Sequence, residues 1–287
     1  HVVSVAEVRF DGLNIAIDTA NGSASVCAKE IFTRLGAKCH MLSDTPNGVN
    51  INLNCGSTHP EELMAFVKAN KLDLGVAFDG DADRMLAVDE NGDLVDGDKI
   101  IAICAAQMKQ DGKLAKNTAV VTVMSNMGFF KFCEENDIKC AKTAVGDRYV
   151  LETMRQNDYN FGGEQSGHVI FLDYATTGDG ELSAVKLIET VVKSGATLGS
   201  LAKIMTVYPQ VLINVPVTPQ GKLKYNNDEY IISAVQEAEM DLNGDGRVLV
   251  RVSGTEPLVR VMLEGKNIEQ ITKLGNQIAE VVKERLS

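Results

Sequence analysis

The chain has 287 residues, 45% of them hydrophobic and 23% charged, which is ordinary for a folded globular protein and excludes an intrinsically disordered one. Its formal net charge of −11 argues against a broad nucleic-acid-binding surface, and no apolar run approaches the roughly 18 residues of a membrane span. Six scattered Cys without a C-x-x-C pair indicate reduced thiols, so we expect a cytoplasmic protein with neither nucleic acid nor membrane as a partner.

The first hundred residues alternate between strand and helix signals. Short apolar runs predict buried strands at residues 13–18 and 72–78. Two helical patterns lie between them. The first runs to Leu35, with Gly36 placed to end it. The second opens at Thr58-His59-Pro60-Glu61, which matches a capping box, and runs through residue 70.

A hairpin and a second run of alternating elements continue the pattern. Asn91-Gly92 is a strong turn signal between two short strands, residues 85–89 and 94–95. A polar stretch at 109–117 is interpreted as a linker. Strand and helix patterns then alternate again at 119–124, 127–135, 138–143 and 148–155.

The last seventy residues follow another polar stretch, 218–228. They predict a helix, a turn, two adjacent strands and a final helix, at 229–240, 243–246, 247–252, 258–263 and 268–286. The predicted fold class is therefore α/β, with two consecutive α/β domains with mixed sheets followed by a small α+β C-terminal domain. The predicted boundaries are 1–109, 110–218 and 219–287.

An acidic loop, Asp79-Gly80-Asp81-Ala82-Asp83-Arg84, directly follows a predicted buried strand. Alternate carboxylates converge only if the chain bends, which the small Gly80 and Ala82 permit. At a separation of ~4 Å each pair repels by about 1–4 kcal/mol, a cost that a divalent cation removes. An all-oxygen ligand set favours Mg²⁺ or Ca²⁺ over Zn²⁺, and a solvated acidic turn is the alternative.

Two known acidic motifs compete for this loop. An EF-hand is excluded, because it needs Gly at position six, where Arg84 stands, and helices at its flanks, where strands are predicted, although Glu90 does fall at position twelve. A second acidic turn, 241–246, has Val252 at position twelve and is interpreted as a plain turn. The haloacid-dehalogenase phosphatase motif would make Asp79 a phosphoryl-accepting nucleophile, with Asp83 at its Thr/Val position, and it stays as an alternative.

The glycine-rich run 161–168 is the second candidate site. Its glycines let the backbone approach a ligand, while Glu164 and Ser166 offer an acceptor and a hydroxyl suited to the vicinal hydroxyls of a sugar. A plain loop is an equally good interpretation. His168 is a candidate proton carrier or a structural side chain.

The third candidate is the run 251–257 between two predicted strands. Arg251 can bind a phosphate bidentately, and Ser253 and Thr255 can donate hydroxyls. Gly254 lets backbone N–H groups turn inward as an anion-binding nest, and Arg260 follows on the next strand. Metal, hydroxyl and phosphate loops on three predicted domains suggest a phosphosugar held in a cleft between them.

At these loops the sequence resembles the α-D-phosphohexomutase superfamily, and within it the bacterial phosphoglucosamine mutases. The matching strings are D-G-D-A-D-R (79–84), G-G-E-Q-S-G-H (162–168) and R-V-S-G-T-E-P-L-V-R-V-M-L-E-G (251–265). Supporting strings are T-V-M-S-N-M-G (122–128), V-G-D-R-Y-V (145–150) and T-G-D-G (177–180). The resemblance extends from about residue 11 to residue 287.

The resemblance implies a role for each matching residue. Mg²⁺ would be bound by Asp79, Asp81 and Asp83, and a phosphosugar would be the substrate. The catalytic residues would be Arg84, beside the transferring phosphoryl group, and His168, which approaches the substrate together with the loop 145–148. Sugar hydroxyls would be bound by Glu164 and Ser166. The substrate phosphate that does not react would be bound by Arg251, Ser253, Gly254, Thr255 and Arg260.

The sequence departs from the family pattern in one respect. Members carry a phosphoserine in a T-A-S-H-N-P-like loop of their first domain, and no such loop occurs here. Ser57-Thr58-His59-Pro60 is superficially similar, but we interpret it as structural. The resemblance thus implies domains two to four of a four-domain enzyme, with a missing N-terminal domain that activity requires.

The implied reaction interconverts glucosamine 6-phosphate and glucosamine 1-phosphate through a bisphosphorylated sugar. The chain alone is expected to be inactive as a mutase while retaining weak phosphosugar or metal binding. Three alternatives stay open: a phosphomannomutase or phosphoglucomutase, a non-catalytic phosphosugar-binding module, and a phosphatase that uses Asp79. A homodimer is an open option for its oligomeric state.

Overall fold

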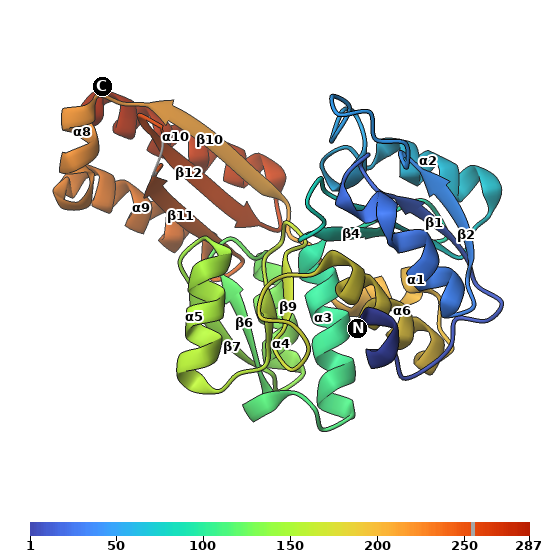
Figure 1. The fold of residues 1–287 in the computed structure, drawn as a ribbon. Coiled ribbons are helices and arrows are strands. Elements are labelled where there is room, and N and C mark those ends of the chain that lie inside the picture. Colours follow the sequence, from blue (N-terminus) through green and yellow to red (C-terminus); the bar gives the residue numbers. More distant parts are fainter. Residues whose placement is uncertain (254–255) are drawn as a thin grey trace. The chain divides into compact units, whose positions relative to one another are not determined.

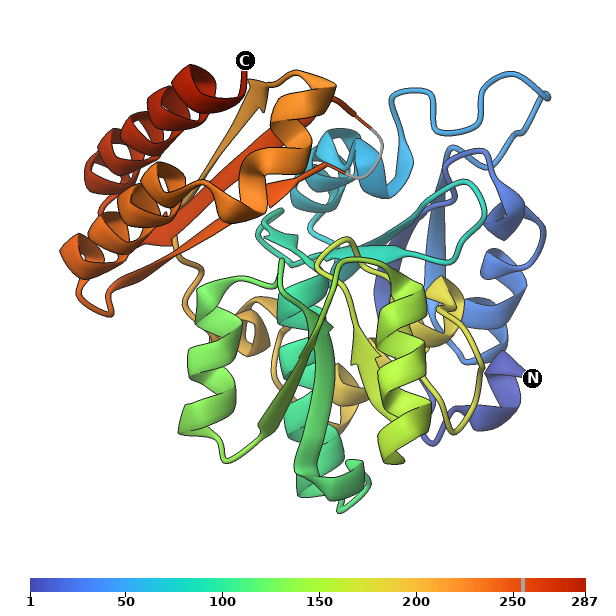
Figure 2. The same ribbon diagram turned by 90° about the vertical axis from the view of Figure 1, so that its left-hand side faces the viewer.

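The computed structural model describes residues 1–253 and 256–287. The chain forms two compact units, residues 1–125 with 129–206, and residues 126–128 with 207–287. Figures 1 and 2 show the ribbon from two directions. Among the described residues, no helix is both long and apolar enough to cross a membrane.

The first sheet of the larger unit has the strand order β2-β1-β3-β4-β5. The first three strands in this order run parallel, and β4 and β5 are antiparallel to their neighbours, so the sheet is mixed as predicted. The turn at Asn91-Gly92 closes the expected hairpin, with the Gly92 N–H donating to the Asp89 carbonyl at 3.0 Å. The strands are β1 (Asn14–Asp18), β2 (Lys38–Leu42), β3 (Leu74–Phe78), β4 (Met85–Val88) and β5 (Leu94–Val95).

Two helices connect the parallel strands, α1 (Ala28–Arg34) and α2 (Glu61–Asn70). The α1 helix ends where the sequence predicts, because Gly36 has φ +104° and its N–H reaches the Thr33 carbonyl at 3.0 Å. The capping-box prediction for α2 is wrong. Thr58 lies in a 3₁₀ turn, Gly56–Thr58, and no side chain caps the helix N-terminus.

The second sheet has the order β7-β6-β8-β9, with β6 parallel to β7 and β8, and β9 antiparallel. It too is mixed, which confirms the predicted fold class. Its strands are β6 (Thr118–Thr122), β7 (Lys139–Thr143), β8 (Phe161–Gly163) and β9 (Val169–Phe171), and its connecting helices are α4 (Met127–Glu135) and α5 (Asp147–Asn157).

One continuous apolar core joins the two sheets of the larger unit. Two long helices, α3 (Gly97–Gln110) and α6 (Gly180–Ser194), contribute to it and were absent from the predicted elements. A short helix, α7 (Leu198–Leu201), follows. The α2 helix covers the other face of the first sheet, and α5 packs with the second sheet in a separate small cluster (Figure 1).

The smaller unit has an antiparallel sheet in the order β10-β12-β11. The strand β10 pairs with β12 along its whole length, so the sequence-based boundary at residue 218 lies beyond a strand of this sheet. The polar stretch 218–228 is largely helical. The elements are β10 (Gln210–Pro216), α8 (Pro219–Lys224), α9 (Glu229–Leu242), β11 (Gly246–Val252), β12 (Leu258–Gly265) and α10 (Ile268–Leu286).

Strand pleat sorts the side chains of the smaller sheet onto two faces. Alternate residues of β11 and β12, such as Val250 and Val261, pack in one core with α9 and α10. Four of the intervening positions carry charges, and the register sets Arg251 opposite Arg260 and Arg247 opposite Glu264.

Candidate functional site

Three loops of the larger unit leave the carboxyl ends of parallel strands, where open α/β sheets bind ligands. Asp79 directly follows β3, Gly146 follows β7 closely, and Glu164 directly follows β8. Backbone hydrogen bonds join two of these loops, because the Met85 N–H donates to the Gly167 carbonyl at 3.0 Å. Two of the three sequence-predicted sites are therefore contiguous.

The acidic turn, residues 79–84, bends at one residue. Ala82 has φ +60°, and its N–H donates to the Asp79 carbonyl at 3.1 Å. Gly80 does not have a positive φ. Its lack of a side chain instead lets the side chains of two other residues pack closely against it. A Cβ there would lie 2.7 Å from atoms of Ile51 and Asn52. The sequence correctly indicates a bend, but Ala82 makes it.

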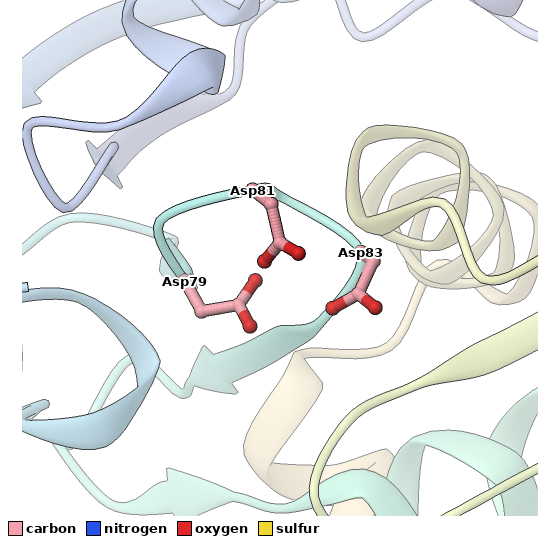
Figure 3. A group of neighbouring side chains, drawn as sticks. All are labelled: Asp79, Asp81 and Asp83. Carbon is pink, nitrogen blue, oxygen red and sulfur yellow. The ribbon is translucent and has the colours of Figure 1, made fainter. Parts of the chain in front are cut away.

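The bend brings three carboxylates together (Figure 3). One oxygen from each of Asp79, Asp81 and Asp83 lies within 4.8 Å of the others. Asp79 is buried, Asp83 is half-buried and Asp81 is exposed, so the cluster has a buried floor and an open side. Burial raises the pKa of Asp79, the Arg84 N–H lowers it, and the neighbouring charges of Asp83 and Asp81 raise it.

The carboxylate cluster fits a divalent cation. Asp83 Oδ1 is buried and has no hydrogen-bond partner among the described residues. The Arg84 guanidinium lies nearby, with its Nε 3.8 Å from Asp79 Oδ2 and 3.8 Å from Asp83 Oδ1. Three converging carboxylate oxygens form the type of donor set that hard cations take.

Glu164 begins a tight turn that ends at Gly167, whose φ is +94°. The Glu164 carbonyl accepts from the Gly167 N–H at 3.0 Å, and its side-chain Oε1 accepts from the Gly146 N–H at 3.0 Å. The carboxylate is thus anchored on the neighbouring loop. Ser166, at the tip of the turn, is exposed. Both side chains lie in the same unit as the acidic turn.

His168 is buried, with 2% of its surface exposed. Its Nδ1 lies 3.2 Å from Asp83 Oδ2 and its Nε2 lies 3.1 Å from the Gly178 nitrogen. Arg84, by contrast, has an exposed side chain beside the carboxylates. These contacts link the acidic turn, the 164–168 turn and the segment around Gly178.

The third candidate lies in the smaller unit, at the end of the β11–β12 pair. Arg251 is partly buried, and burial together with the nearby Arg260 guanidinium lowers its pKa. Arg260 donates from Nη2 to Glu256 Oε2 at 2.8 Å. Ser253 is buried, and its Oγ accepts from the Glu256 N–H at 3.2 Å. The predicted residues Gly254 and Thr255 lie outside the described residues.

Sequence reasoning missed several residues that build these loops. Ser23 N–H donates to the Gly80 carbonyl at 2.9 Å, and the Gly180 N–H donates to the Ala82 carbonyl at 2.9 Å. A Cβ on Gly97 would lie 2.4 Å from the Glu164 carbonyl oxygen. Gly97 and Gly180 begin the helices α3 and α6, which the sequence-based prediction missed, so their contacts could not be predicted either.

Models of the phosphoglucomutase/phosphomannomutase family match the chain in three consecutive segments. Alpha/beta/alpha domain II matches residues 1–92, alpha/beta/alpha domain III matches 96–208, and the C-terminal domain matches 212–281. The larger unit therefore contains two family domains, and the smaller unit corresponds to the third.

Curated relatives of high identity are phosphoglucosamine mutases. The protein of Brevibacillus brevis is 54% identical over 286 residues, covering 100% of this chain and 63% of its own length. The Bacillus subtilis protein is 52% identical over 281 residues, covering 98% and 62%. The chain thus spans somewhat less than two thirds of the length of these relatives.

Solved structures share the fold at low identity. A structure of Aspergillus fumigatus N-acetylphosphoglucosamine mutase aligns with TM-score 0.82 and 20% identity, covering 99% of this chain and 62% of that one. Another structure of the same fungal enzyme, in complex with GlcNAc-6P and magnesium, aligns with TM-score 0.76 and 20% identity, covering 100% and 64%.

Proposed function

We propose a function from the premise that the chain belongs to the phosphoglucomutase/phosphomannomutase family. The chain supplies the cation-binding, hydroxyl-binding and phosphate-binding parts of a phosphoglucosamine mutase. Such an enzyme interconverts glucosamine 6-phosphate and glucosamine 1-phosphate. The observation that carries this proposal is the joining of the acidic turn to the 164–168 turn, through Met85 and Gly167 and through Asp83 and His168. The high identity to phosphoglucosamine mutases supports the choice of substrate.

The metal-binding part consists of Asp79, Asp81 and Asp83. Enzymes of this family use a metal ion, and these carboxylates could hold one. We propose Mg²⁺, because all donors are oxygens. When bound, it neutralises the negative charge that develops on a transferring phosphoryl group. The exposed Arg84 guanidinium, beside the same carboxylates, would contact that phosphoryl group.

The substrate is held by two further sets of side chains. Glu164 accepts hydrogen bonds from sugar hydroxyls, and its anchoring by the Gly146 N–H fixes its position. Ser166 offers a hydroxyl from the exposed tip of its turn. Arg251, Arg260 and Ser253, with Gly254 and Thr255, bind the phosphate that does not react. Two guanidinium groups facing each other across the strands favour a dianion.

The phosphoryl group would come from a serine outside these 287 residues, and it would return there from a bisphosphorylated sugar. We therefore expect the chain alone to bind its ligands weakly and to show no mutase turnover. The six free thiols support our assignment of the protein to the cytoplasm. Light scattering of the purified chain distinguishes a monomer from a homodimer.

A chimaera tests this function directly. In the Brevibacillus brevis relative, this chain replaces the 286-residue segment that it matches at 54% identity. We expect the chimaera to convert glucosamine 6-phosphate to glucosamine 1-phosphate, and to lose at least 100-fold in rate on Asp81→Asn, since the charge stabilisation depends on the metal. A folded chimaera that prefers mannose or glucose phosphates would instead support the phosphomannomutase or phosphoglucomutase alternative.

The phosphatase alternative has its own readout. A nucleophilic Asp79 would form an acyl phosphate that hydroxylamine traps, so labelling of Asp79 in the isolated chain would contradict the mutase proposal. Phosphosugar binding by the chain without turnover in the chimaera would favour a non-catalytic binding module.

A further inference from the structure

Asp18 is a buried carboxylate to which the proposed function gives no role. It ends β1, stands opposite Ala77 of β3 in the sheet register, and is completely buried. Burial raises its pKa, and backbone hydrogen bonds from Gly56 and Ala20 lower it. Because a buried carboxylate is costly unless its oxygens are hydrogen-bonded, the partners of these oxygens show which segments Asp18 joins.

The two oxygens of Asp18 bind two different loops. The first loop, residues 19–23, follows β1, and its Ala20 N–H donates to Oδ1 at 2.9 Å. The second loop, residues 43–56, follows β2, and its Gly56 N–H donates to Oδ2 at 2.8 Å. One side chain therefore joins segments that are more than thirty residues apart at their bonded positions.

Both loops pack against Gly80, in the middle of the acidic turn. From the first loop, the Ser23 N–H donates to the Gly80 carbonyl at 2.9 Å. From the second loop, Ile51 and Asn52 approach so closely that a Cβ on Gly80 would lie 2.7 Å from each. The loops also bind each other, since the Asn52 N–H donates to the Ala20 carbonyl at 2.9 Å. Gly80 is thus held between two loops that one carboxylate joins.

We propose that Asp18 is a positioning residue for the acidic turn. Its carboxylate holds both loops against Gly80, which stands between the first two of the three converging aspartates. Without this support the turn can open, and its carboxylates no longer converge on one cation. The inference rests on the proposed metal site, but the state of the turn can be measured without a metal.

Asp18→Asn removes one of the two hydrogen bonds at nearly constant side-chain volume. An amide has one oxygen acceptor, so one of the two backbone N–H groups is left facing an NH₂ group. Thr118→Val is the matched control. Thr118 lies on β6 in the other sheet, is 1% exposed, and would lose its hydrogen bond to the Lys116 carbonyl.

A second variant leaves Asp18 intact and disturbs the same contact from the other side. A Cβ on Gly22, in the first loop, would overlap the Gly80 carbonyl oxygen. Gly22 has φ −108°, so Gly22→Ala introduces this overlap without left-handed strain. It should displace the acidic turn even if Asp18→Asn fails to fold.

Amide hydrogen exchange of the metal-free chain measures the opening of the turn. The Ser23 amide reports on its bond to Gly80, and the Lys38 amide, which donates to the Leu13 carbonyl at the other end of the β1–β2 pair, is the reference. We expect Asp18→Asn to speed exchange at Ser23 about 5–150-fold, as one unpaired buried N–H implies, and at Lys38 by no more than about twofold. Unchanged exchange at Ser23, or equal acceleration at both amides, overturns the proposal.

Mn²⁺ binding, with the free ion measured by electron paramagnetic resonance, tests the consequence for the metal site. We expect Asp18→Asn and Gly22→Ala to weaken binding about 10–100-fold, the usual effect of losing an outer support of the ligands, and Thr118→Val to stay within about threefold of wild type. Wild-type affinity in either variant, or an equal loss in the control, contradicts the proposal. If wild type binds no Mn²⁺ while the Ser23 amide responds as expected, the proposed metal site fails and the positioning of the turn stands.

Discussion

Ala82 illustrates how much of the site a sequence can predict at the scale of one residue. Alternating Asp residues with small spacers correctly predict that the chain bends and that three carboxylates converge. They do not predict that Ala82, with φ +60°, makes the bend while Gly80 makes room for Ile51 and Asn52. That division depends on a loop about thirty residues away, which no local pattern reveals.

A substitution at Gly167 tests the contact between the acidic turn and the 164–168 turn. A Cβ at this residue would lie 2.4 Å from the Met85 carbonyl oxygen, and the backbone has φ +94°. Gly167→Ala is expected to lower the free energy of unfolding by about 3 kcal/mol or more, from left-handed strain of about 1–2 kcal/mol plus displacement of backbone.

The matched control is Gly112→Ala, which has φ +68° and no atom within 4 Å of the added Cβ. It should cost only the strain, about 1–2 kcal/mol. Urea denaturation measures both variants. Equal losses would show that the close approach of residues 85 and 167 contributes nothing to stability.

Glu7, which lies outside the candidate sites, should make the free energy of unfolding depend on pH. Hydrogen bonds from Lys113 at 2.5 Å and Lys193 at 2.7 Å lower its pKa from 4.5 to about 2. A lowered carboxyl pKa stabilises the fold above the unfolded value of 4.5, and this contribution is lost as pH falls from about 4.5 to about 2. Between pH 7 and pH 3, wild type should lose more unfolding free energy than Glu7→Gln. Parallel pH profiles of the two proteins would contradict this.

At the scale of elements, two helices are predicted to their exact ends. The helices 127–135 and 268–286 agree with α4 and α10. The sequence-based prediction missed α3 and α6, most of whose residues are buried. Residues 100–106 of α3 are a continuous apolar run, which periodicity alone does not assign to a helix or to a strand. Glu264 stands inside the apolar strand β12, and no local pattern indicates its role.

Glu264 is fully buried and ties together several segments of the smaller unit. It accepts from Arg247 Nε at 2.6 Å and from the Met127 N–H at 2.8 Å. Arg247→Met leaves a buried carboxylate without its counter-charge and should cost about 3–5 kcal/mol in unfolding free energy.

The exposed pair in the same unit is the control. Lys266 Nζ lies 2.6 Å from Asp245 Oδ1, with both side chains about 60% exposed, so Lys266→Met should cost no more than about 1 kcal/mol. Differential scanning calorimetry measures both. A smaller loss for Arg247→Met than for Lys266→Met would refute a stabilising role for the buried pair.

At the scale of the whole molecule, the sequence predicts the fold class of the three domains better than it predicts the boundaries between them. The boundary at 218 falls in a polar stretch, but β10 belongs to the sheet of the smaller unit because it pairs with β12. The boundary is decided by sheet pairing between residues far apart in the sequence, and the local composition gives no information about that pairing. The candidate loops stand out in the sequence because each combines glycine with chemically distinctive side chains, which a motif records directly.

The proposal that this chain binds a phosphosugar can be tested on the purified chain. Calorimetric titration with glucosamine 6-phosphate in the presence of Mg²⁺ tests it most directly. We predict one equivalent bound, with Arg251→Ala weakening affinity about 10–100-fold, the loss expected from a charge-assisted hydrogen bond of about 1.5–3 kcal/mol. Ser166→Ala should weaken it less, and the exposed Arg34→Ala not at all. If wild type binds no glucosamine 6-phosphate, or if Arg251→Ala binds it as tightly as Arg34→Ala, the claim is contradicted.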